Sequence, residues 1–143
     1  MGATKLEKIL ITPLSRISNA NGDILHAMKK GDPGFNGFGE VYFSIIHGGS
    51  IKAWKRHIRM TLNLVVPFGG VEFIFSDGHG NFRMERVGQE RYARLTVPPG
   101  IWFGFMGLNN PHSILMNCAD IPHEPSEIER KELDEIPYKW SAK

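Results

Sequence analysis

Short apolar runs separated by turn residues constrain the fold of this chain more than any other feature. The 143 residues include 16 glycines and 9 prolines, which are spread along the whole sequence. Short apolar runs bounded by glycine, proline and asparagine are typical of β-strands joined by tight turns. We therefore expect an all-β domain, a sandwich or barrel of antiparallel strands. The expected strands span residues 9–13, 39–47, 50–67, 71–76, 82–87, 92–97, 101–106 and 113–119.

Two segments depart from this pattern. Residues 20–38 are rich in Gly, Asp, Asn and Lys, which predicts a long loop around a short strand or turn near residues 24–28. Residues 125–133 predict a short C-terminal helix, with Ser126 as N-cap and acidic residues in the first turn. Tyr138 and Trp140 are expected to fix the C-terminus to the body or to a second subunit.

Composition narrows the classes of partner. The net charge is +2, from 17 basic and 15 acidic residues, and no basic block indicates a nucleic-acid surface. No apolar run approaches the roughly 18 residues of a membrane span, and the N-terminus lacks a signal-like apolar segment. Cys118 is the only cysteine, so no intrachain disulfide is possible, and we interpret it as an inert core thiol. We expect one cytoplasmic domain over residues 1–143, with no membrane partner.

Residues 52–64 place an unusual set of side chains on one strand face. At the two-residue period of a strand, one face is mostly apolar and runs from Trp54 to Leu64. The opposite face carries side chains that bind anions or move protons: Lys55, His57, Arg59, Thr61 and Asn63. If that face is enclosed, it is a binding site. The alternative is a solvated polar face on an edge strand.

A metal site is not expected on this strand. Barrel metal sites use two histidines one residue apart, a nearby Glu and a third His after a later turn. Here Lys55 stands at the place of one histidine, and Trp102 or Phe103 follows the turn at Pro98–Gly100. We therefore predict a protein without metal or cofactor.

The polar face permits acid–base chemistry and anion binding. Lys55 and Arg59 flank His57, and two such cations should lower the pKa of its imidazole, so that His57 acts as a general base. A desolvated Lys55 would act as a base or as a Schiff-base nucleophile. Lys52, Lys55, Arg56 and Arg59 also suit a phosphate or diphosphate, the alternative being a surface patch.

Two further points bear on this site. Lys52 has the wrong parity to share a face with Lys55 in a regular strand, unless a bulge near Gly49 and Ser50 changes the register. Trp102 could stack on a base or sugar, although aromatic residues in such a strand more often belong to the core.

Several segments together resemble the cupin-fold dTDP-4-dehydrorhamnose 3,5-epimerase family and its ketoisomerase relatives. The likeness runs from about residue 9 to residue 140, and the following segments carry it: 21–26, 49–57, the turn at Asp77, 97–105 and 119–120. The resemblance implies a cupin-type jelly-roll β-barrel, a homodimer, and metal-free action on a nucleoside-diphosphate 4-keto sugar.

The family's catalytic pair is altered in this sequence. The epimerase motif Arg-Gly-Leu-His places Lys52 at the arginine and Lys55 at the catalytic histidine. In the ketoisomerase motif His-x-His, Lys55 replaces the first histidine and His57 matches the second. The tyrosine that serves as acid should lie on the 113–119 strand, where Met116 and Asn117 stand.

These points give one preferred function and two alternatives. We expect epimerisation or isomerisation of a nucleoside-diphosphate 4-keto-6-deoxysugar in surface-polysaccharide biosynthesis, by metal-free proton transfer. The predicted catalytic residues are Lys55 and His57, and the predicted substrate-binding residues are Lys52, Arg59, Asn63 and Trp102, with Arg59 or Asn63 polarising the ketone. The first alternative is a sugar-nucleotide-binding cupin that has lost catalysis, and the second is a purely structural dimer partner.

Overall fold

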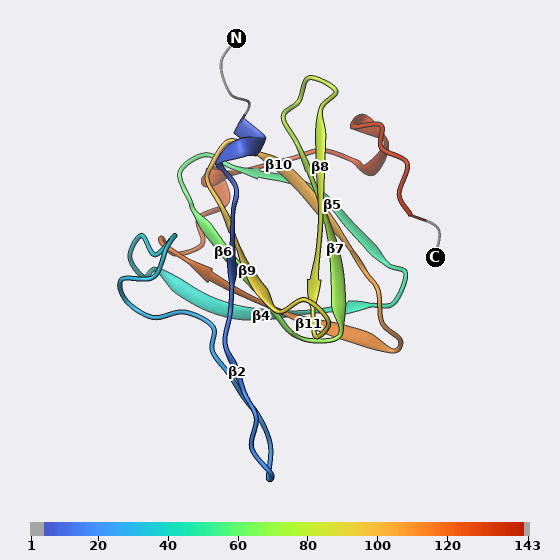
Figure 1. Cartoon of the computed structure of the whole chain (residues 1–143). Helices are drawn as coiled ribbons and strands as arrows, with labels where there is room; N and C mark the ends of the chain where they lie inside the picture. Colours follow the sequence, from blue (N-terminus) through green and yellow to red (C-terminus); the bar gives the residue numbers. More distant parts are fainter. Residues whose placement is uncertain (1–4, 142–143) are drawn as a thin grey trace.

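Two five-stranded antiparallel sheets face each other across a shared core in the computed structural model, which describes residues 5–141 (Figure 1). The first sheet has the order β1 (Leu10–Pro13), β9 (Ala93–Val97), β6 (Leu62–Phe68), β11 (His112–Ala119), β4 (Glu40–His47). The second has the order β12 (Ile128–Arg130), β5 (Ile51–His57), β10 (Trp102–Gly107), β7 (Gly70–Ser76), β8 (Phe82–Gly88). The all-β, antiparallel prediction is confirmed.

The remaining elements are short. Strands β2 (Arg16–Ile17) and β3 (Ile24–Leu25) form a hairpin that projects away from the two sheets (Figure 1). The helical segments of the described residues are the 3-10 turns η1 (Lys5–Lys8), η2 (Pro125–Glu127) and η3 (Leu133–Glu135). None of them has the length and apolar character that crossing a bilayer requires.

The core follows from the two-residue period of the strands. Phe73 and Phe75 of β7 and Phe103 of β10 point between the sheets, where they meet the apolar side chains of β6 and β9. The outer face of the second sheet carries a separate cluster around Trp54 and Trp102. Tyr138 and Trp140 pack on this cluster, so the C-terminal segment is fixed to the body of the same chain.

The predicted strand over residues 50–67 is wrong, because the structure divides it between the two sheets. Strand β5 ends at His57, and β6 begins in the opposite sheet at Leu62. Two carboxylates hold the intervening turn. The backbone N–H groups of residues 59 and 60 donate to Glu127 at 2.6 Å each, and that of residue 61 donates to Asp120 at 2.9 Å. The turn therefore separates the side chains of Lys55 and His57 from those that follow it.

The predicted helix over residues 125–133 is also wrong. A 3-10 turn begins at Pro125, and the chain then extends as β12 alongside β5, pairing Ile128 with His57 and Arg130 with Lys55. Without β12, strand β5 would present a row of unpaired backbone groups at the sheet edge. The Glu127 side chain is only 1% exposed, and its burial depends on this extended path of the chain beside β5. These long-range contacts outweigh the local preference for a helix.

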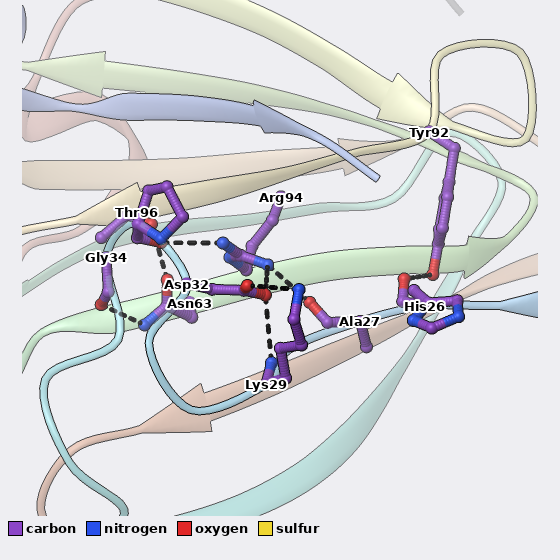
Figure 2. A network of polar contacts seen from close by, with 10 residues as sticks. His26, Ala27, Lys29, Asp32, Gly34, Asn63, Tyr92, Arg94 and Thr96 are labelled. Carbon is purple, nitrogen blue, oxygen red and sulfur yellow. Dashed lines mark hydrogen bonds and ion pairs between the residues drawn. The ribbon is translucent and has the colours of Figure 1, made fainter. Parts of the chain in front are cut away.

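The loop after the β2–β3 hairpin is tied to β9 by a buried arginine (Figure 2). Arg94 is fully buried, donates to the carbonyl oxygens of Ala27 and Pro33 at 2.7 Å, and lies 3.5 Å from the Asp32 carboxylate. Asn63 of β6 donates to the Gly34 carbonyl oxygen at 3.1 Å. The polar residues of this region therefore fix the loop to the first sheet.

Candidate functional site

A cavity of about 530 Å³ lies at the end of the sandwich where β4 and β11 face β5, β10 and β12. This volume is in the range of small-molecule sites. Its floor is apolar, made of Leu64, Phe103, Phe105 and Leu115. Its rim is rich in cations: Lys52, Lys55, Arg130 and Lys131. An apolar floor with a cationic rim suits a ligand that joins a sugar or base to a phosphate.

A bulge in β5 brings Lys52 and Lys55 to the same side of the sheet. Lys52 is opposite Phe105 and Lys55 is opposite Phe103, so three steps along β5 match two along β10. The extra residue is Trp54, which turns to the outer cluster. The bulge therefore lies at residues 53–54, and not at the expected 49–50.

Glycine at position 104 permits this bulge. The β-carbon of any other residue there would overlap with the side chain of Ala53. Close approach of β5 to β10 thus requires glycine, and it places both lysines on the cavity rim.

Lys55 lies half-buried in an electropositive setting. Its Nζ is 5.9 Å from the centre of the Phe103 ring, and it forms no ion pair with a carboxylate in the described part of the chain. Burial lowers the pKa of Lys55 below its usual range, and the nearby charges of Arg130 and Lys52 lower it further. A lysine with a lowered pKa carries more neutral amine near pH 7, and only the neutral amine accepts a proton.

Tyr42 supplies the cavity with a hydroxyl that the sequence did not reveal. Tyr42 of β4 is directly opposite Asn117 of β11, and both line the cavity. The Asn117 Nδ2 group donates to Tyr42 Oη at 2.9 Å. Because Oη accepts this bond, its own hydrogen is free to point to a ligand. On the 113–119 strand, where the family resemblance places a tyrosine, Asn117 therefore binds the hydroxyl of a tyrosine on the neighbouring strand.

His57 forms a buried pair with Glu127, and its side chain is not on the cavity wall. Their Nδ1 and Oε1 atoms are 2.7 Å apart. Burial lowers the pKa of His57, although the hydrogen bond to Glu127 opposes this shift. Burial alone would raise the pKa of Glu127, but the hydrogen bonds from His57 and two backbone amides together hold it below its usual value. We conclude that Glu127 is ionised and that neutral His57 donates from Nδ1 to it.

This pair predicts a loss of stability on acidification. The folded-state pKa of each group lies below its ordinary value, 6.5 for His57 and 4.5 for Glu127, so the unfolded chain binds more protons than the folded chain in acid. We expect this pair to make its full contribution to the free energy of unfolding above pH 6.5. The contribution should decrease as the pH falls from there towards 4. Urea unfolding at a series of pH values measures this. In His57→Asn the fall between pH 6.5 and 5.5 should be smaller, and an unchanged fall would refute the assignment.

Three residues predicted to bind substrate lie away from the cavity. Arg59 is exposed on the turn that follows β5, and its backbone amide binds Glu127. Asn63 accepts a hydrogen bond from Thr96 at 2.6 Å and faces the 26–34 loop (Figure 2). Trp102 is on the outer face, with the Arg56 guanidinium 4.6 Å from its ring centre. The strand break at residues 58–61 and the outward parity of Trp102 account for these placements.

The cavity instead draws on segments to which the sequence assigned other roles. Arg130 and Lys131 come from the region predicted as a helix, and Tyr42 and Asn117 come from the predicted strands 39–47 and 113–119. These residues reach the cavity because β12 pairs with β5 and β4 pairs with β11. No local sequence pattern indicates either pairing. Residues 5–141 contain no group of three His, Cys, Asp or Glu side chains placed to hold a metal ion.

Comparisons with known proteins agree with this architecture. The chain is 33% identical to a dTDP sugar isomerase from Desulfovibrio desulfuricans G20, with a TM-score of 0.90, over 98% of this chain and 95% of that one. It has the same fold as the sugar 3,4-ketoisomerase QdtA from Thermoanaerobacterium thermosaccharolyticum, at 15% identity and a TM-score of 0.76, over 92% of this chain and 96% of that one.

The chain is also similar in sequence to one curated protein. The probable low-salt glycan biosynthesis epimerase Agl13 of Haloferax volcanii is 25% identical over 104 residues, 68% of this chain. The match spans 65% of the length of that relative. No family model matches the sequence. The 33% identity to the solved isomerase, over nearly the whole of both chains, indicates common descent.

Proposed function

Because the chain belongs to the cupin-fold family of dTDP-sugar isomerases and epimerases, we propose that it epimerises or isomerises a nucleoside-diphosphate 4-keto-6-deoxysugar. One observation carries the proposal: a half-buried amine, Lys55, and a hydroxyl with a free hydrogen, Tyr42, line the same cavity. Proton transfer next to a ketone requires a base for the C–H group and a donor for the carbonyl oxygen.

In the proposed first step, neutral Lys55 removes the proton from the carbon next to the ketone. The C–H electron pair forms a carbon–carbon double bond, and the carbonyl electron pair moves to the oxygen, which Tyr42 stabilises by donating its hydrogen bond. Asn117 holds the Tyr42 oxygen at 2.9 Å and so fixes the direction of this donor. The products of the step are an enolate, whose oxygen accepts the Tyr42 hydrogen bond, and a Lys55 ammonium.

The second step decides the product. Return of a proton to the same carbon from the opposite face gives the epimer. When the deprotonated carbon carries a hydroxyl, this hydroxyl passes its proton to the enolate oxygen beside it, and return of a proton to the former carbonyl carbon gives the ketoisomer. Lys55 begins both outcomes, but its ammonium returns a proton only from its own face. Epimerisation therefore also requires a donor on the opposite face of the sugar, a role that we assign to water.

Binding of the nucleotide follows from the rim charges. Lys52 is the cation that we assign to the diphosphate, while Phe103 and Phe105 form an apolar surface for the sugar. Lys52 keeps the binding role predicted from the sequence. We assign His57 to the support of the β5 end rather than to the reacting atoms.

Isotope exchange tests the proposal. Incubation with dTDP-4-keto-6-deoxyglucose in heavy water should introduce deuterium at the ring carbon next to the ketone, observed by NMR and mass spectrometry. Absence of deuterium from every ring carbon, across several nucleotide sugars, would refute it.

The Tyr42 hydroxyl should contribute mainly to the chemical step. We expect Tyr42→Phe to lower kcat by about 10²–10³-fold, the usual cost of removing one donor to a developing oxyanion, with little change in KM. The matched control is Tyr138→Phe, since Tyr138 packs in the outer aromatic cluster and should keep the wild-type kcat. Steady-state kinetics decides the matter, and a Tyr42→Phe enzyme with full kcat would remove Tyr42 from the mechanism.

A binding protein without catalysis is the second candidate, because a lysine stands where the family has its catalytic histidine. Calorimetry with dTDP and UDP would then show binding while no ring carbon exchanges its hydrogen. The isotope experiment above separates the two.

We further propose a cytoplasmic homodimer that acts in surface-glycan biosynthesis. The glycan biosynthesis epimerase Agl13 supports the pathway, and the free thiol of Cys118 is compatible with a reducing compartment. Exposed apolar side chains on the outer face of β4, those of Val41, Phe43 and Ile45, support burial against a second copy. Light scattering after gel filtration tests the dimer.

A further inference from the structure

Two cations stand directly opposite each other at the mouth of the cavity. Arg130 of β12 is the cross-strand partner of Lys55 of β5, and both side chains line the cavity. Side chains of directly opposed residues on an antiparallel pair point to the same face, with Cβ atoms about 5 Å apart. Like charges at such positions normally destabilise a sheet. The pair therefore needs an explanation other than stability.

The surroundings of the pair leave its charge uncompensated. Neither Lys55 nor Arg130 forms an ion pair with a carboxylate among residues 5–141. Lys52 adds a third cation from β5 on the same rim, and His57 at the end of β5 is neutral by the argument above.

The segment after β12 does not neutralise the pair either. Lys131 lies with its Nζ 5.0 Å from the ring centre of Trp102. The carboxylate of Glu135 accepts a hydrogen bond at 2.7 Å from the backbone N–H of Glu132. Glu132 and Glu135 do reach the cavity wall, but neither contacts a cation at ion-pair distance.

We propose that Arg130 is a positioning residue whose charge increases the fraction of Lys55 in its neutral amine form while the cavity holds no substrate. This inference rests on the proposed function, in which neutral Lys55 is the base. When a nucleoside diphosphate binds, its negative charges offset Arg130, so the Lys55 ammonium that forms in the first step is tolerated. Burial lowers the pKa of Lys55 most, and Arg130 is the largest contribution from a neighbouring charge, ahead of Lys52, in agreement with this arrangement.

Competitive acetylation of the ligand-free protein tests the proposal. A short pulse of acetic anhydride labels only neutral amines, and peptide mass spectrometry across a pH series gives the midpoint for Lys55, with exposed Lys139 as internal reference. We expect Arg130→Gln to move the Lys55 midpoint upward by about half a pH unit, which is about threefold less neutral amine at a given pH. Arg130→Lys, which keeps the charge, should restore the wild-type midpoint.

The matched control removes a charge from the other face of β5, the strand that carries Lys55. Arg56 is next to Lys55 in sequence but pairs with Glu129 and lies over Trp102, so Arg56→Gln should leave the Lys55 midpoint unchanged. An unshifted midpoint in Arg130→Gln would overturn the proposal. A midpoint shifted as far in Arg130→Lys as in Arg130→Gln would overturn it too, because packing rather than charge would be responsible.

The labelling experiment requires neither substrate nor turnover, so its result is independent of the proposed reaction. If no nucleotide sugar exchanges deuterium but the midpoint shifts as expected, the electrostatic coupling stands and the reaction fails. If exchange occurs, the acidic limb of the kcat/KM profile should move upward in Arg130→Gln by the same amount as the labelling midpoint.

Discussion

Replacing Lys55 by methionine is expected to lower kcat by about 10²–10⁴-fold, the usual effect of removing a positioned general base. Methionine is close to lysine in length and packs well on the Phe103 ring, so the cavity should keep its shape. Affinity for dTDP should change little, because Lys52 remains to bind the diphosphate. The rate of deuterium exchange measures the first effect, and calorimetry measures the second.

Three further variants separate the role of a base from that of an anion-binding group. Lys55→Arg keeps the positive charge but cannot deprotonate, so it should be as inactive as Lys55→Met. Lys52→Met removes a rim cation without removing the base and should mainly raise KM. Lys55→His restores the family's residue, and activity that appears only in this variant would show that the natural chain has lost catalysis. Full kcat in Lys55→Met would contradict the account.

The largest stability effect is expected at Glu127. Its buried carboxylate accepts hydrogen bonds from the backbone amides of Arg59 and Met60 at 2.6 Å and pairs with His57 at 2.7 Å. Glu127→Ala leaves these donors unsatisfied in the interior, which should lower the free energy of unfolding by about 3–5 kcal/mol. Urea denaturation at pH 7 is the appropriate measurement.

Glu129 provides a matched comparison two residues further along. Its carboxylate pairs with Arg56 at the surface, where such ion pairs contribute about 0–1 kcal/mol. Glu129→Ala should therefore lower stability much less than Glu127→Ala. Equal losses in the two variants would show that the hydrogen bonds of Glu127 do not hold the turn between β5 and β6.

The strands were largely predictable because their signals are local. Alternating apolar residues and glycine-containing turns mark β7, β8, β10 and β11 within a few residues of their observed bounds. The break between β5 and β6 was not predictable, since residues 58–61 have no turn signal and the carboxylates that hold them come from residues 120 and 127. The same reason hid β12, whose formation depends on the exposed edge of β5.

The candidate site was predictable only in part. The dense cations of residues 52–59 indicated an anion site, and Lys52 and Lys55 do line the cavity. Their common face depends on the bulge at residues 53–54, which a regular two-residue period cannot reveal. Tyr42 and Arg130 were not predicted as site residues, because each reaches the cavity through pairing with a strand distant in sequence.

A crystal structure of Lys55→Met with dTDP-4-keto-6-deoxyglucose tests the central claim most directly, since loss of the base should preserve the substrate. We predict that the sugar lies on Phe103 and Phe105, with its ketone oxygen within hydrogen-bond distance of Tyr42 Oη and the adjacent C–H group towards residue 55. The diphosphate should lie beside Lys52. A nucleotide sugar bound on the outer face at Trp102, with the cavity empty, would contradict the account.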